Sequence, residues 1–375
     1  MARRAGKRTD RPDAGRLKPR LKRWTLIAAA LFGAALVAAA APIAAIEAGC
    51  GRGAQPPESK PPLVADDGYR RAGGDSFLTY PEWYIVHAYA DLAGVTARSS
   101  ESAFDYAGSV SGFWTSLCRA TAVARGMGPT TLDQRITNYV IGLSFTLEMA
   151  VQGLYERTIG ALTVWSRGPE RTPEDAINLR FLQAYAAFLE QTPWYRYPFG
   201  DELGRLWGEP WSGRSALRSA ERRAALSLEY GFKALYAKAM GALAGYAPAD
   251  LTMMSVVAGG RAGDAPGVEV LRELGEGQSL VRTPRYAAFT DILKIWARNG
   301  TAVAEIAGNR RILVTVIAPN GTSFEDADSR TVFALPIQSR PGWARTGYDV
   351  PVERLTALIA AIEAQGAAFE HAYDY

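Results

Sequence analysis

Histidine and cysteine are scarce in this chain of 375 residues, and each occurs only twice, as His87, His371, Cys50 and Cys118. A zinc site typically uses three or four protein ligands, many of them His or Cys. A Ser-His-Asp triad needs a histidine beside its nucleophile. The glycine-rich segment 259–263 lacks the spacing of a phosphate loop and has no helix after it. We therefore expect no metal and no cofactor, and no enzyme class is indicated.

An excess of basic residues is also missing from most of the chain. The net charge is +4, but residues 1–23 alone carry ten Lys and Arg against two Asp. The remaining residues hold 32 Lys and Arg against 36 Asp and Glu. A nucleic-acid surface requires basic clustering on the folded body. We therefore expect no nucleic-acid partner and interpret the basic tail as the flank of a membrane span.

The longest run without a charged side chain extends from Trp24 to Ile46, where Thr25 is the only polar residue. As a helix it measures about 34 Å, enough for a hydrocarbon core of about 30 Å. The positive-inside rule keeps residues 1–23 in the cytoplasm and predicts a single-span inner-membrane protein with its C-terminal part in the periplasm. Two alternatives remain open. One is a cleaved secretory signal, and the other is a lipoprotein acylated at Cys50.

Composition divides the rest of the chain into three parts. Residues 47–76, rich in Gly, Pro and charge, predict a linker lying over the surface. Residues 77–247 predict an all-α domain, and residues 248–375 a smaller α+β sandwich domain, so the expected fold class is α+β. Outside the cytoplasm Cys50 and Cys118 could form a disulfide, and the alternative is two free thiols.

Local patterns set the expected elements. Thr131 and Thr172 stand at helix starts, the first with a capping-box spacing and the second followed by proline. Gly308-Asn309 predicts a hairpin between two strands. The strand–helix order after residue 248 suggests a ferredoxin-like arrangement with one extra strand. The predicted strands cover 251–258, 301–307, 311–318, 331–337 and 367–373, and the helices 284–298 and 352–365.

Two helical segments resemble each other at an offset of 81 residues, 144–162 (SFTLEMAVQGLYERTIGAL) and 227–243 (SLEYGFKALYAKAMGAL). We interpret them as an internal repeat, with chance similarity of two Ala/Leu-rich helices as the alternative. Residues 140–162 have the length of a second span. However, Glu148, Glu156 and Arg157 would each cost about 2.5–3.5 kcal/mol near a bilayer centre. The sequence therefore predicts a buried core helix.

The repeat aligns Glu148 with Glu229 and Tyr155 with Tyr236. Two carboxylates that approach each other can share a proton or a cation, which would suit a hydrolase. The structural alternative pairs Glu229 with Lys233 at i,i+4 and lets Glu148 bond Gln152 or a tyrosine. These four repeat residues and His87 are the candidate catalytic residues.

Three further groups have a structural interpretation beside a functional one. Tyr80, Tyr84, His87 and Asp91 could share one helix face, for acid–base work or as a polar rim. Residues 221–223 (Glu-Arg-Arg) indicate a solvated helix face. The helical region also holds several tryptophans, which could line a lipid or glycan groove but more often belong to the core: Trp83, Trp114, Trp165, Trp194, Trp207 and Trp211.

Three stretches carry a family resemblance, namely FLTYPEWYIVHAY, the LExxxQxLYERTIG helix and RYAAFTDIL…IAGNRRILVTVIAP. Together they resemble a family of uncharacterised bacterial proteins with one N-terminal span. The resemblance covers most of residues 77–375 and implies an envelope location and a shared fold, but no activity. His87 stands where the family pattern suggests a tyrosine.

The sequence thus predicts a membrane-anchored extracytoplasmic binding or scaffold protein of the cell envelope. Its partners would be the membrane, through Trp24 to Ile46, and an envelope protein or a lipid or glycan ligand. The alternative is an envelope hydrolase with a carboxylate and tyrosine site between the two related helices.

Overall fold

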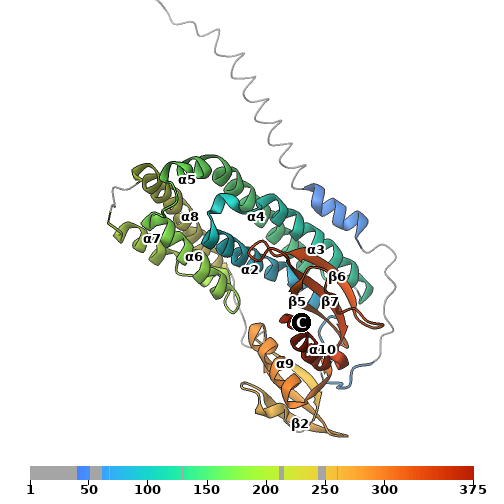
Figure 1. Cartoon of the computed structure of the whole chain (residues 1–375). Coiled ribbons are helices and arrows are strands. Elements are labelled where there is room, and N and C mark those ends of the chain that lie inside the picture. Colours follow the sequence, from blue (N-terminus) through green and yellow to red (C-terminus); the bar gives the residue numbers. More distant parts are fainter. Residues whose placement is uncertain are drawn as a thin grey trace, which may run out of the picture. The chain divides into compact units, whose positions relative to one another are not determined.

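Helices come first along the chain and strands last, as predicted, and the fold class is α+β (Figure 1). The computed structural model describes residues 40–50, 61–66, 68–128, 130–210, 215–243, 251–259 and 261–375. No helix within these ranges is long and apolar enough to cross a membrane. Most of the predicted span, residues 24–39, lies outside them, and residues 40–49 are helical.

Helix starts follow the predicted caps. The Thr131 side chain accepts a hydrogen bond from the amide of Gln134, and Thr172 forms a reciprocal capping box with Asp175. Pro81 lies inside the first long helix, which begins at Asp75. The helices are α2 (Asp75–Arg98), α3 (Tyr106–Gly126), α4 (Leu132–Tyr155), a π-helical turn (Glu156–Gly160), α5 (Ala161–Arg167), α6 (Pro173–Leu189), α7 (Phe199–Gly208) and α8 (Ala216–Leu243).

The strands form two antiparallel sheets of four, with orders β2-β3-β1-β4 and β6-β7-β5-β8. Sheet A contains β1 (Thr252–Ala258), β2 (Glu269–Gly275), β3 (Gln278–Pro284) and β4 (Ala302–Ile306). Sheet B contains β5 (Arg311–Pro319), β6 (Arg330–Pro336), β7 (Trp343–Pro351) and β8 (Ala368–Tyr373). Two helices, α9 (Ala287–Asn299) and α10 (Leu355–Ala364), interrupt the strands.

The ferredoxin-like expectation is wrong, because that fold has one sheet and this region has two. The hairpin predicted at Gly308 is found only as a tight turn, in which Ile306 and Asn309 form a single antiparallel bridge. Strands β4 and β5 flank this turn but belong to different sheets. Gly308 has a positive φ of 72°, and a Cβ there would lie 2.9 Å from the Arg70 side chain. The turn therefore passes the chain between sheets under the segment around residue 70.

Sheet B is covered on both faces. Successive side chains of β5 point to opposite faces of the sheet, and five in a row, residues 312–316, are buried. Ile312, Val314 and Val316 join α9, α10 and part of sheet A in one buried apolar core. On the other face, the amide of Leu313 donates to Ser76 Oγ of α2 at 2.9 Å. Helix α2 thus packs directly on sheet B, and residues 50–375 form one compact unit.

The two cysteines are joined, so of the two alternatives the disulfide between Cys50 and Cys118 is found. Part of the predicted linker lies against the sheets, as expected. The amide of Leu63 donates to Glu305 Oε1 at 2.9 Å, and Arg71 donates to the carbonyl of Thr252 at 2.8 Å.

Candidate functional site

Helix α8 turns its charged side chains inward. Arg218 is 0% exposed and Arg222 is 2% exposed. The opposite face of the same helix is apolar and open, with Leu228 76% exposed. The prediction that residues 221–223 form a solvated face is therefore wrong, since Arg222 is buried.

Helix α4 and its continuation show the same inversion. The helix that was predicted to be a buried core helix is buried only in part. Phe145 and Met149 lie in the interior and Glu148 contacts α8, whereas one apolar side is exposed. We call the exposed apolar side chains of both helices the outer face. Its large members are Ile136, Val140, Leu147, Val151, Leu154, Ile159, Leu162 and Trp165 with Leu217, Leu228, Phe232, Leu235 and Tyr236.

The two helices run antiparallel along a line of polar contacts, which we call the charged seam. Lys233 Nζ lies 3.0 Å from Glu148, and Arg222 lies 2.5 Å from Glu156. Farther along, Arg218 donates to Thr163 Oγ1 at 3.0 Å. Along the seam the residue numbers therefore rise from 148 to 163 on α4 and α5 and fall from 233 to 218 on α8, as expected for antiparallel helices.

Arg218 and Arg222 are enclosed by carboxylates. Arg218 contacts Asp175 at 2.8 Å, Glu221 at 2.9 Å and Glu101 at 3.4 Å. The Arg222 guanidinium contacts Glu221 at 3.2 Å as well as Glu156. The two arginines and Arg167, which contacts Asp175 at 3.0 Å, thus face four buried carboxylates. One carboxylate is in excess, and a buried unpaired charge is costly.

Glu156 is the carboxylate that carries this excess. Burial raises its pKa to about 7, although the neighbouring Arg222 opposes the shift. Its Oε2 has no hydrogen-bond partner among the described residues. Glu156 also begins the π-helical turn, a feature that often marks functional sites, and a Cβ on Gly160 would clash with its carboxylate. The turn and the glycine together make room for a buried acid that can be protonated near neutral pH.

Glu148 and Glu229 do approach each other, but a lysine joins them. Lys233 Nζ lies 3.0 Å from Glu148 and 2.9 Å from Glu229, so the expected i,i+4 pair is confirmed. Tyr89 donates to Glu148 and accepts from Lys233 at 3.0 Å. Burial would lower the pKa of Lys233, but the two carboxylates hold it well above its usual value. The group is a stable ammonium and cannot act as a nucleophile.

The two tyrosines of the repeat do not converge with the glutamates. The Tyr155 hydroxyl donates to Glu221 within the seam. Tyr236 lies on the outer face, with its ring centroid 4.9 Å from that of Trp194. The fold therefore brings Glu148 and Glu229 together but separates Tyr155 from Tyr236.

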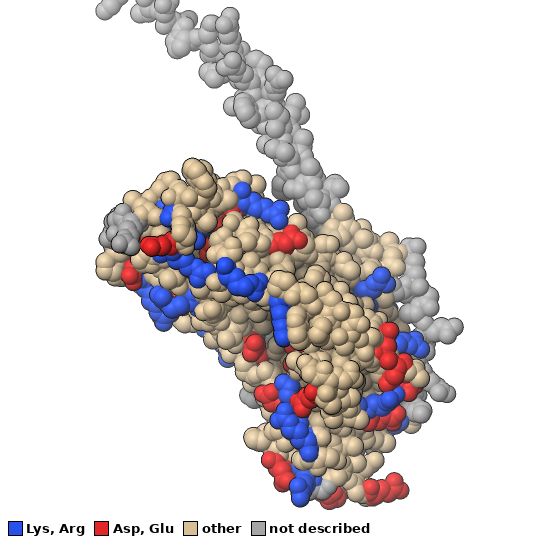
Figure 2. Space-filling view, viewed as in Figure 1, with Lys and Arg blue, Asp and Glu red and all other residues tan. Residues whose placement is uncertain are grey.

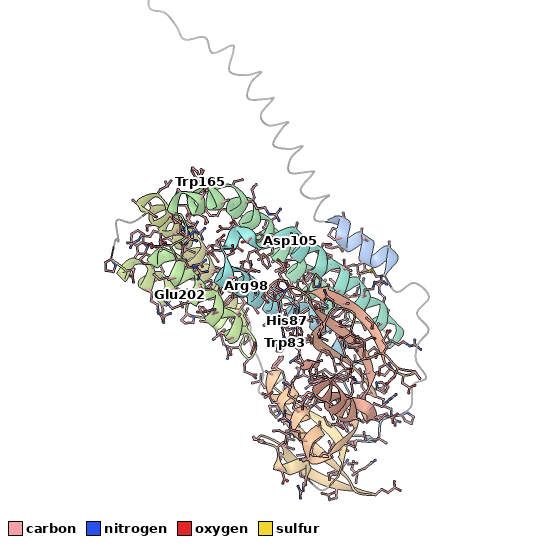
Figure 3. All side chains as sticks on the ribbon, in the orientation of Figure 1. Trp83, His87, Arg98, Asp105, Trp165 and Glu202 are labelled. Atoms are coloured by element: carbon pink, nitrogen blue, oxygen red, sulfur yellow. A yellow bond between two sulfur atoms is a disulfide. The ribbon has the colours of Figure 1, made fainter. Side chains whose placement is uncertain are left out.

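His87 belongs to a different region, between α2 and sheet B (Figure 3). Its Nδ1 lies 3.7 Å from Glu370, and its Nε2 lies 3.3 Å from the Tyr373 hydroxyl. Burial and then Arg345 lower the pKa of His87 to about 3. Burial would raise the pKa of Glu370, but Arg345, at 2.7 Å, brings it to about 2. The histidine is therefore neutral at physiological pH.

The helix face around His87 is buried, not a polar rim. Tyr84 donates to the carbonyl of Ser109 at 2.6 Å, and Asp91 accepts from the amide of Ser339 at 3.3 Å. Tyr80 is fully enclosed beside Phe333, with 4.3 Å between ring centroids. These contacts join α2 to α3 through Ser109 and to the sheet B region through Phe333 and Ser339.

In both polar clusters the charged side chains contact one another. No group of three or more His, Cys, Asp or Glu that could hold a metal occurs in the described ranges. A shallow depression on α7 and α8 is lined by Trp207, Arg223 and small residues of α8, not by a carboxylate pair. Among the tryptophans, Trp83 is buried whereas Trp165 projects from the outer edge of α5, 80% exposed (Figure 3).

Sequence reasoning missed the most constrained residues, Glu101, Glu156, Arg218 and Arg222. One signal was available. The charges of α8 recur at three- and four-residue spacing opposite a stripe of large apolar residues. The pattern does not show which side of the helix faces inward. The usual assumption, that the apolar side faces the core, is wrong for α8.

Comparison with known proteins adds no assignment. No family model, curated protein or solved structure matches the chain. The resemblance through FLTYPEWYIVHAY therefore stays a prediction, and the function is argued from the geometry of this chain.

Proposed function

We propose that the protein is a membrane-anchored extracytoplasmic binding or scaffold protein of the cell envelope. The single observation that carries this proposal is the inversion of α4 and α8, which satisfies their charges internally and presents apolar side chains outward. Large exposed apolar surfaces mark interaction sites. A binding role requires such a surface, whereas a hydrolase requires an accessible acid and base.

Two observations support the location. The disulfide between Cys50 and Cys118 favours an oxidising compartment. It also uses the sulfur that a lipoprotein would acylate, which favours anchoring through Trp24 to Ile46. Together with the basic residues 1–23, these features support a single span in the inner membrane with the folded part in the periplasm.

Topology can be tested with a reporter fused after Tyr375. A phosphatase that folds only outside the cytoplasm should be active, and a fluorescent protein that folds only inside should be dark. The opposite pair of signals would overturn the location. Peptide mapping without reductant should recover the Cys50–Cys118 peptide from the cells.

Binding and hydrolysis can be separated by complementation of a deletion strain. We expect Glu148→Gln and Glu229→Gln to complement, because the amides keep the shape of the seam. Leu154→Asp with Phe232→Asp should fail to complement at equal protein abundance, since both positions lie on the outer face. Loss of complementation by the amide variants alone would favour the hydrolase.

A further inference from the structure

We propose that the outer face of α4, α5 and α8 lies on the phospholipid surface of the membrane that anchors the chain. This inference rests on the proposed anchorage and names the occupant of the apolar surface. The helices would lie in the plane of the interface, as monotopic amphipathic helices do.

The first support is that both apolar stripes face the same side. Val151 and Leu154 are the third and sixth residues after Glu148, and Phe232 and Leu235 are the third and sixth after Glu229. All four are exposed. Because the helices are antiparallel and meet at equivalent glutamates, they are related by a twofold axis perpendicular to the seam. Such a rotation leaves both stripes on one side of the pair.

The second support is the length and composition of the stripe. From Ile136 to Trp165 it extends over about 44 Å of helix. Over residues 136–165 and 216–241, which the structure describes throughout, the only exposed charged side chains are Arg157 and Lys238. Uncharged surface covers most of the edge formed by α4 and α5 in Figure 2.

Those charges favour a lipid over a second copy of the chain. Lys238 is a cation, which complements the anionic headgroups of a bilayer, and Arg157 already pairs with Asp105 at 3.3 Å. A symmetric dimer through this face would have to bury these charges, whereas long side chains at a bilayer can reach the headgroups. Trp165, at the end of the stripe, is a residue type that concentrates at the level of the headgroups.

The third support is the short tether. Ile46 ends the apolar run four residues before Cys50, a reach of about 14 Å at most. Cys50 is bonded to Cys118 on α3. Helix α3 in turn packs on α4, where Trp114 Nε1 donates to Thr146 Oγ1 at 2.9 Å. An anchored chain therefore holds the helix that carries the outer face close to the bilayer.

The test uses the full chain reconstituted in phosphatidylcholine vesicles that contain phosphatidylglycerol. An environment-sensitive dye is attached, without reductant, at Leu154→Cys or Phe232→Cys on the outer face. The matched control is Asp291→Cys on α9, where the side chain is 72% exposed. Spin labels on the lipid chains should reduce the dye signal about two- to threefold at both face positions and leave the control unchanged. Aqueous iodide should quench only the control.

Each other outcome has its own meaning. Iodide quenching at Leu154 and Phe232 in a chain that still floats with vesicles would overturn the lipid contact and leave the anchorage standing. Dyes shielded from both quenchers, with cross-links between copies at Leu154→Cys, would assign the face to a dimer and also overturn it. A chain that fails to float would remove the anchorage itself. An intact Cys50–Cys118 peptide verifies folding in every sample.

Discussion

In the sheet-bearing part, β5 buries Ile312, Val314 and Val316 against α9 and α10. In the helical part, α8 buries Arg218 and Arg222 and exposes Leu228 and Phe232. The first arrangement gains stability from apolar burial in water. The second exposes one apolar side of α4 and α8, and its interior combines ion pairs with buried apolar side chains such as Phe145, Met149 and Leu226. The difference indicates that the two parts face different surroundings, with the helical pair suited to a non-aqueous contact.

The two buried polar clusters differ in the same sense. Between α2 and sheet B, Glu370 and Arg345 balance each other and His87 stays neutral. In the charged seam, carboxylates outnumber cations, and burial raises the pKa of Glu156 to about 7. The charge of the cluster between α2 and sheet B is therefore constant over the physiological pH range, whereas the charge of the seam changes within that range.

The largest contrast should come from truncating one apolar residue in each part. Trp296→Ala removes a fully buried side chain of the sheet core and should lower the free energy of unfolding by about 3–5 kcal/mol. Leu228→Ala on the outer face should change it by less than about 0.5 kcal/mol in water. Urea unfolding followed by circular dichroism measures both. Equal losses would mean that Leu228 is part of a core.

Removing a cation from the charged seam should lower the free energy of unfolding nearly as much as truncating a core residue. Arg222→Met leaves Glu156 without its buried cation and Glu221 with Arg218 alone, and should cost about 3 kcal/mol. Arg157→Met is the matched control, because its pair with Asp105 is half exposed on both sides and should be worth less than about 0.5 kcal/mol. Thermal unfolding of the two variants gives the comparison, and similar melting temperatures would contradict it.

How far the sequence predicts this molecule depends on the kind of pattern involved. Thr131 and Thr172 cap their helices because capping depends on neighbouring residues alone. Strands β2, β3 and β7 were missed. Most side chains of β2 are exposed on both faces, so this strand shows no alternation. Gly308 correctly predicts a turn, but local sequence does not determine that the flanking strands join different sheets.

The candidate site was predicted in part for similar reasons. The i,i+4 pair of Glu229 and Lys233 is local, and the repeat correctly placed Glu148 opposite it. Glu101 and Arg218 come together from positions far apart in the chain. Periodicity gives the polar and apolar sides of α8 but not their surroundings, so the inversion became visible only in the folded chain.

The next contrast concerns pH. The raised pKa of Glu156, from 4.5 to about 7, means that the folded state binds more protons in this window. This group's contribution is therefore present below about pH 4.5 and lost as the pH rises through about 7, an effect of about 3 kcal/mol. His87, with its lowered pKa, acts in the opposite direction between about pH 3 and 6.5. The two effects overlap, so a variant is needed to separate them.

Glu156→Gln should separate them, because glutamine mimics the protonated acid at every pH. The variant should gain stability relative to the parent chain as the pH rises from 5 to 8, by about 2.5 kcal/mol over that interval. Urea midpoints measured at one-unit intervals would show it. A constant difference between the two curves would mean that Glu156 keeps an ordinary pKa in the fold.

The smallest effects should come from the lysine shared by the two related helices. Glu148→Gln and Glu229→Gln each leave Lys233 with one carboxylate, so each should cost about 1 kcal/mol or less. The double variant leaves a buried ammonium without a counter-charge. It should therefore lose about 1 kcal/mol more than the two single losses together. Strict additivity in chemical unfolding would show that the two carboxylates act independently. In that case α4 and α8 would be similar in geometry, but their glutamates would not be coupled through Lys233.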